Sequence, residues 1–166
     1  IRKENLLGTE GAGFKVILDG MNAERILIAA ECIGDGRYFI DKASHYATER
    51  VVFDRPIGQN QGVQFPIARC YAEVEAAWLM VEKAARMFDA GEACGAEANM
   101  AKMLDYEDSW RAGDVCMQTD GGFAVAKEYH IERKFRETRL YQIAPISTNL
   151  ILSFIGEHVL GMPRSF

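Results

Sequence analysis

The sequence is poor in the features that mark zinc-binding, extracellular or membrane proteins. Its cysteines lie far apart, with no C-x-x-C pair and no histidine at ligand spacing: Cys32, Cys70, Cys94 and Cys116. This argues against a structural zinc site, and no metal is expected. We expect reduced thiols that serve as small core side chains in a cytoplasmic protein. No stretch approaches the roughly 20 apolar residues of a membrane span, so no membrane partner is expected.

Positive charge is also scarce. The 19 Lys and Arg residues against 24 Asp and Glu give a formal net charge of -5 and a pI near 5.3. This balance argues against a phosphate-backbone partner, so no nucleic acid is expected. No signal peptide is visible, and the chain begins with Ile1 where a complete protein has Met. We therefore expect a fragment or a processed product.

Helical periodicity dominates the rest of the chain. The 166 residues suffice for one domain, and 49% hydrophobic with 26% charged residues is typical of a soluble globular protein. Apolar residues recur at three- and four-residue steps and predict helices over 22–50, 63–90, 95–119, 130–140 and 147–160. These helices predict an all-α fold, an up-down helical bundle. Asn22 is the expected N-cap of the first helix. Gly34 and Gly36 inside it are each expected to mark a close helix–helix approach.

The first segment differs from the remainder. It holds four glycines, with residues 5–8 typical of a strand end and turn and residues 11–13 of a loop. It has too little apolar surface to be a domain by itself. We therefore expect residues 1–20 to be a short β and loop remnant of another domain, and residues 21–166 to form the helical bundle.

Four segments carry motifs that occur in one known family. They are residues 5–14 (NLLGTEGAGF), 50–61 (RVVFDRPIGQNQ), 118–122 (QTDGG) and 136–143 (RETRLYQI). Their order and spacing resemble those of the acyl-CoA dehydrogenase family over essentially the whole chain. The resemblance implies a C-terminal helical bundle, preceded by the last piece of the family's middle β-domain. Asp54 departs from the family pattern, which has Gly at this position.

The resemblance implies FAD as cofactor. In the family, the arginine that matches Arg50 clasps the flavin pyrophosphate of a neighbouring subunit, a role suited to a guanidinium. The implied cofactor-binding residues are Arg50, Phe53, Gln61, Gln118, Gly121, Gly122, Ser147, Thr148 and Asn149. The residues alone leave ordinary roles open. Arg50 could cap a helix, the two glycines could end one, and Ser147 could begin one.

The family reaction also needs a desolvated carboxylate as base. Most members carry it as Glu just before the last helix, where this chain has Pro145. A minority, including isovaleryl-CoA and long-chain dehydrogenases, carries Glu directly before Arg in the first bundle helix. Glu24 and Arg25 match that pattern, which implies Glu24 as the catalytic base and Arg25 and Asn22 as substrate-binding residues. The residues alone favour the simpler interpretation of Glu24 as an acidic side chain stabilised by the helix dipole, and the missing glutamate at Pro145 favours the catalytic one.

The implied activity is oxidation of a fatty acyl-CoA to its 2,3-enoyl-CoA by α-proton abstraction and hydride transfer to flavin. Electron-transfer flavoprotein is the implied acceptor, and a homodimer or homotetramer the implied assembly. The chain by itself is expected to be inactive. Two alternatives stay open: an acyl-CoA oxidase-like relative, and a non-catalytic helical oligomerisation module.

Overall fold

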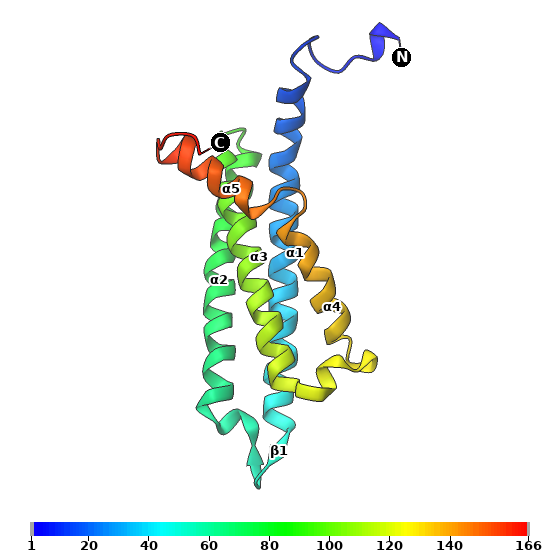
Figure 1. The fold of residues 1–166 in the computed structure, drawn as a ribbon, viewed down its shortest axis with the longest axis vertical. Coiled ribbons are helices and arrows are strands. Elements are labelled where there is room, and N and C mark those ends of the chain that lie inside the picture. The colour runs from blue at the N-terminus through cyan, green and yellow to red at the C-terminus, as the bar shows by residue number, and fades with distance from the viewer. Residues whose placement is uncertain (1, 166) are drawn as a thin grey trace.

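The computed structural model describes residues 2–165 as a helical bundle (Figure 1). The three long helices α1 (Gly13–Glu49), α2 (Gln61–Asp89) and α3 (Gly95–Asp120) lie side by side and alternate in direction. The shorter α4 (Ile131–Thr138) packs beside α1 and α3, and α5 (Thr148–Phe154) crosses one end and continues as a π-helical turn, Ile155–Val159. The predicted all-α, up-down bundle is confirmed.

Short elements connect the helices. A two-stranded antiparallel hairpin pairs β1 (Val51–Val52) with β2 (Arg55–Pro56), in the register Val51 with Pro56. The 3-10 turns are η1 (Lys3–Asn5), η2 (Ile57–Gln59), η3 (Gly121–Val125), η4 (Lys127–Tyr129) and η5 (Arg139–Gln142). The hairpin and η3 lie at the same end of the bundle, where α1 and α3 both end (Figure 1). We call this the hairpin end, and we call the opposite end, which α5 crosses, the α5 end.

Small side chains let the three long helices approach closely. Alanines recur in the buried seam between them, including Ala29, Ala77, Ala98 and Ala101. A Cβ atom on Gly36 would lie 2.9 Å from Cγ2 of Val74, so Gly36 marks a close approach as predicted. The same prediction for Gly34 is wrong, because Gly34 is exposed with open space around it. All four cysteines are buried free thiols.

The start of α1 differs from the prediction. The helix begins at Gly13 with Ala12 as its N-cap, so the predicted N-cap at Asn22 is wrong. Residues 11–13 were predicted as a loop, but the helix already begins at Gly13, and no proline interrupts residues 13–20. Each added helical residue gains a backbone hydrogen bond, which offsets a glycine cost of about 1 kcal/mol. Turns do occur at Gly8 and Gly11, where φ is positive, and no strand occurs among residues 2–20. The assignment of residues 1–20 to a preceding domain stays a prediction.

The core also contains polar side chains. One face of α3 buries Asn99, Lys102, Asp105 and Ser109 together with its alanines. Both carboxylate oxygens of Asp105 lack a hydrogen-bond partner among the described residues, and burial raises the pKa of Asp105 to about 9. Within residues 2–165, no helix is long and apolar enough to cross a membrane. The same residues hold no cluster of three or more His, Cys, Asp or Glu arranged for a metal.

Candidate functional site

A cleft at the hairpin end joins three of the predicted cofactor residues. Arg50 follows the last turn of α1, and Gly121 and Gly122 follow the last turn of α3. Because α1 and α3 both end at the hairpin end, these residues meet although they are about 70 positions apart in the sequence. The cleft has a volume of about 470 Å³ and is lined by Tyr46, Arg50, Val52, Ile57, Thr119, Asp120, Gly121, Gly122 and Phe123. Gly121 has φ +58°, a conformation suited to glycine, and open space where a side chain would lie.

The electrostatics of this cleft depend on Arg50. Two helix C-termini meet here, and their partial negative charge disfavours an anion. Asp120 also lines this cleft and is 4% exposed. Burial raises the pKa of Asp120 to about 6, although the hydrogen bond that the Cys116 thiol donates to its carboxylate opposes the rise. The Arg50 side chain forms no ion pair with the described residues, so its charge is available to a phosphate. Sequence reasoning did not single out Asp120, because the resemblance of residues 118–122 depends on Gln118 and the two glycines.

The hairpin turn carries a strained aromatic residue. Phe53 and Asp54 both have positive φ, +52° and +61°, the conformation of a tight two-residue hairpin turn. The backbone at position 54 is in the left-handed region, where glycine is favoured, as in the family pattern noted above. Asp is one of the non-glycine residues that adopt this conformation more readily than most. Phe53 is 93% exposed, so it does not belong to the core. Its ring is free to contact a ligand or a partner. Gln61 and Gln118 are also exposed near this end.

The remaining predicted cofactor residues lie toward the α5 end. Ser147 is the N-cap of α5, and its Oγ accepts a hydrogen bond from the Leu150 amide at 3.5 Å. Oγ1 of Thr148 is buried and lacks a hydrogen-bond partner among the described residues, whereas Asn149 is exposed. We call residues 143–147, which connect η5 to α5, the strap. The strap is fixed to α3 by Lys102, whose Nζ donates to the carbonyl oxygen of Ile146 at 2.8 Å.

A second cleft lies where α1, α3 and the strap meet. It has a volume of about 320 Å³ and is lined by Leu18, Asn22, Arg25, Gly95, Asn99, Ile146, Phe154 and His158. Arg25 is only 6% exposed, donates from Nη1 to Oδ1 of Asn22 at 2.9 Å, and has a buried Nε without a partner among the described residues. Burial lowers the pKa of Arg25, while the neighbouring Glu24 charge raises it. The structure thus brings together the two predicted substrate-binding residues.

Glu24 does not line this second cleft. It is exposed on α1, and two helical positions correspond to a rotation of about 200°, so Glu24 lies on nearly the opposite face from Asn22. The same face of α1 continues through Ile28 and Glu31, one and two turns further along. Among the described residues, Glu24 therefore lies on a surface apart from the pair formed by Asn22 and Arg25.

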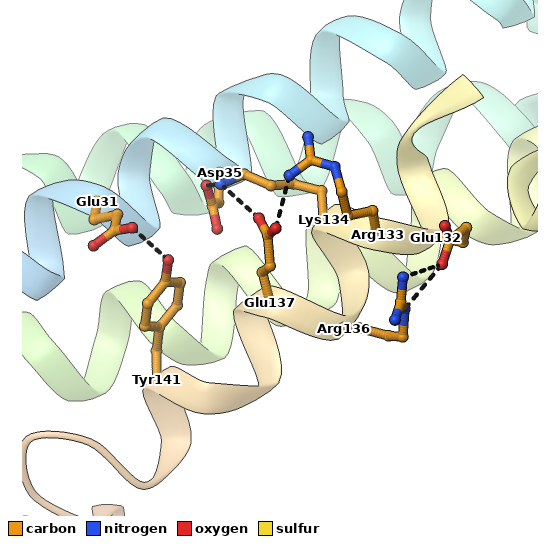
Figure 2. A network of polar contacts seen from close by, with 8 residues as sticks. All are labelled: Glu31, Asp35, Glu132, Arg133, Lys134, Arg136, Glu137 and Tyr141. Atoms are coloured by element: carbon orange, nitrogen blue, oxygen red, sulfur yellow. Dashed lines mark hydrogen bonds and ion pairs between the residues drawn. The ribbon is translucent and has the colours of Figure 1, made fainter. Parts of the chain in front are cut away.

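A polar network fixes α4 and η5 to this face of α1 (Figure 2). The hydroxyl of Tyr141 donates to Oε1 of Glu31 at 2.6 Å, and Lys134 forms an ion pair with the buried Asp35. Burial raises the pKa of Asp35, although the hydrogen bond and charge of Lys134 oppose the rise. A groove of about 560 Å³ runs beside the network, lined by Ile28, Glu31, Arg133, Arg136, Glu137, Leu140 and Tyr141. Sequence reasoning identified residues 136–143 as a segment that resembles the family, but it did not identify the contact with α1.

The two groups of predicted cofactor residues lie far apart in one copy of the chain. Lys102, which holds the strap, and Asp120, which borders the glycine turn, are 18 residues apart on α3. At 1.5 Å per residue, they are separated by about 27 Å along the helix axis. Ser147, Thr148 and Asn149 therefore lie about that far from the cleft that contains Arg50.

Comparison with known proteins gives consistent matches. A family model described as acyl-CoA dehydrogenase, C-terminal domain, matches residues 11–160. The acyl-CoA dehydrogenase FadE12 of Mycobacterium tuberculosis strain H37Rv is 42% identical over 163 residues, covering 97% of this chain and 42% of that protein.

Solved structures agree with the sequence matches. The butyryl-CoA dehydrogenase of Megasphaera elsdenii has a TM-score of 0.93 at 29% identity, covering 96% of this chain and 42% of that one. The FAD complex of PigA has a TM-score of 0.92 at 27% identity, covering 98% and 42%. This chain thus spans about two-fifths of the length of the proteins it matches.

Proposed function

Because the chain belongs to the acyl-CoA dehydrogenase family, we propose that it acts as the C-terminal helical domain of an FAD-dependent enzyme. That enzyme would oxidise acyl-CoA to 2,3-enoyl-CoA. The observation that carries the proposal is the hairpin-end cleft, where Arg50 meets Gly121 and Gly122. These three residues come from two motifs of the family, and the fold joins them in one place. Without the preceding parts of its relatives, the chain alone would be inactive.

The residues of the hairpin-end cleft fit a flavin dinucleotide. Arg50 would hold the pyrophosphate, since its guanidinium is exposed and without an ion-pair partner among the described residues. Gly121 and Gly122 would allow close approach of the main chain, and Phe53 and Gln61 would contact the adenosine half. Gln118 borders the same turn. FAD, when bound, supplies the acceptor for the hydride from the β-carbon of the substrate. A similar structure, described as the FAD complex of PigA, supports this cofactor.

The separation of the two groups supports an assembly of at least two copies. Ser147, Thr148 and Asn149 would contact one flavin, and the hairpin-end cleft of a neighbouring copy would contact another part of the same molecule. Within one chain, about 27 Å along α3 separates these two groups. One copy would therefore have difficulty contacting a single cofactor with both groups. We therefore propose a homodimer or homotetramer. Separately, we propose electron-transfer flavoprotein as the acceptor of the electrons from the flavin.

Glu24 is the proposed base for removal of the α-proton. Pro145 occupies the place where most of the family carries its glutamate, and proline has no group that takes up a proton. Glu24 is exposed on α1 in this chain, so the preceding domains would have to cover it to exclude water from the carboxylate. Asn22 and Arg25, joined by their hydrogen bond, would contact the CoA part of the substrate from the second cleft, on a different face of α1 from Glu24.

The proposal is tested in the complete enzyme by rapid mixing of acyl-CoA with FAD-loaded protein without oxygen. Glu24→Gln is expected to abolish bleaching of the flavin absorbance while FAD stays bound. Arg50→Met is expected to weaken FAD binding at least tenfold, because the pyrophosphate loses its cation. Near-normal flavin reduction by Glu24→Gln would reject Glu24 as the base. Unchanged FAD binding by Arg50→Met would reject the hairpin-end cleft as a cofactor site.

The same assay separates the two alternative functions. An acyl-CoA oxidase-like relative would consume oxygen directly during turnover, whereas a dehydrogenase would need an added electron acceptor. A non-catalytic oligomerisation module would show neither reaction and would bind no FAD in its complete form.

A further inference from the structure

Lys102 is an unusual residue in this bundle because its side chain is 0% exposed. It lies on the face of α3 that points into the core, and burial lowers its pKa. Among the described residues it forms no ion pair, and its Nζ lies 5.8 Å from the centre of the Tyr106 ring. Within the part of the chain that the structure describes, the one hydrogen bond of its ammonium group goes to the main-chain carbonyl oxygen of Ile146, at 2.8 Å. Burial of a cation without a carboxylate partner costs free energy. The hydrogen bond to Ile146 is the contact that could compensate for this cost by holding the main chain in place.

The carbonyl that Lys102 holds belongs to the strap. The segment before the strap is fixed by side chains: Arg139 donates to the hydroxyl of Tyr106 at 2.8 Å, and Tyr141 donates to Glu31 at 2.6 Å. The hydrogen bond from Lys102 acts 44 positions along the chain and fixes the far end of the strap, directly before α5.

Two proposed binding regions meet at that point. Ile146 lines the cleft that contains Asn22 and Arg25, and the next residue, Ser147, begins the group proposed to contact flavin. A shift of the Ile146 carbonyl would change the shape of that cleft and the placement of Ser147 together. A neutral aliphatic side chain of similar length would fill the same space but could not hold the carbonyl.

We infer that Lys102 is a positioning residue, whose buried ammonium fixes the Ile146 carbonyl and thereby holds the strap in the geometry needed for substrate and flavin. The inference rests on the proposed function, which supplies the ligands that meet at the strap. Lys102 itself touches neither ligand, because its ammonium is buried between α3 and the strap.

The test uses the complete, FAD-loaded enzyme with Lys102→Met, which keeps the length of the side chain and removes the donor. The matched control is Lys127→Met, a change at an exposed lysine of η4. Two quantities are measured: hydrogen–deuterium exchange of the amides in residues 143–150, and kcat and KM for acyl-CoA at saturating FAD. We expect at least tenfold faster exchange in that segment, unchanged exchange in α2, and a kcat/KM lower by at least tenfold. The control should match the wild type.

Each outcome decides the inference. Unchanged exchange of residues 143–150 in Lys102→Met overturns it, whatever happens to activity. Faster exchange with unchanged kcat/KM also overturns it, because the strap would then not position the ligands. If Lys102→Met does not fold, Lys102→Leu, which likewise removes the donor, is judged by the same two measurements. Loss of structure in both variants overturns the inference in favour of a general core role. A wild-type enzyme without acyl-CoA dehydrogenation rejects the proposed function, and exchange alone then decides whether Lys102 holds the strap.

Discussion

Replacement of Asp105 by asparagine is expected to stabilise the protein at neutral pH and to have little effect near pH 4. Asp105 is 1% exposed, and neither carboxylate oxygen has a hydrogen-bond partner among the described residues. Burial raises its pKa from 3.8 to about 9, and the nearby Asp108 charge adds to the rise. The folded state therefore keeps a proton that the unfolded state releases, so stability falls as pH rises from about 4 to about 9.

The size of the effect follows from this difference in proton binding. Neutral pH lies about 3 pH units above 3.8, and each unit corresponds to about 1.4 kcal/mol. At pH 7 the wild-type aspartate thus lowers the free energy of unfolding by about 4 kcal/mol relative to a side chain that never ionises. Asparagine has nearly the shape of the protonated acid and the same lack of partners. For a domain of this length, about 4 kcal/mol corresponds to a rise in Tm of roughly 8–16 °C.

The assay is thermal unfolding of wild type and Asp105→Asn at fixed protein concentration, across pH 4 to pH 9. The two Tm curves should meet near pH 4 and separate steadily as pH rises. Asp114→Asn, at an exposed position of the same helix, is the matched control and should follow the wild type. Parallel curves for wild type and Asp105→Asn would refute the reasoning, because they would mean that the buried carboxyl ionises as readily as in the unfolded chain.

Two further changes test other parts of the structure. Gly121→Ala places a Cβ at φ +58° and should lower the free energy of unfolding by about 1–3 kcal/mol through backbone strain alone, since the space around it is open; urea unfolding measures this, and an unchanged midpoint would contradict it. Tyr141→Phe removes the hydrogen bond to Glu31 and should cost about 1–2 kcal/mol. Faster amide exchange across α4 with an unchanged α2 is the expected signature, and equal exchange in both helices would count against it.

The sequence predicted two of the three long helices closely, because their apolar residues repeat without interruption, but it placed the start of α1 nine residues too late. The predicted spans 63–90 and 95–119 agree with Gln61–Asp89 and Gly95–Asp120 to within two residues at each end. The last helix was predicted as one element over 147–160. In the structure it is α-helical only to Phe154 and continues as a π-helical turn, a change of hydrogen-bond pattern that periodicity does not reveal.

Only those residues of the candidate site that belong to a recognisable sequence motif could be predicted from the sequence. Arg50, Gly121 and Gly122 were found from the resemblance, and the fold brings them into one cleft. Lys102 and Asp105 were not found, because a polar residue within an apolar stripe is read as solvent-facing unless its contacts are known. The roles of Glu24, Asn22 and Arg25 remain predictions, since they depend on contacts with ligands that the described residues alone do not show.

The first turns of α1 have a mechanical consequence. They extend beyond the other long helices as one continuous rod without a hinge (Figure 1). The direction in which residues 2–12 leave the bundle is therefore set by the rotation of this rod. One residue inserted between Gly13 and Asn22 would turn the start of the helix by about 100° and move it by about 1.5 Å. The number of residues in this stretch thus sets the direction in which the chain before Gly13 departs from the bundle, and a deletion here would redirect it without altering any contact among the three long helices.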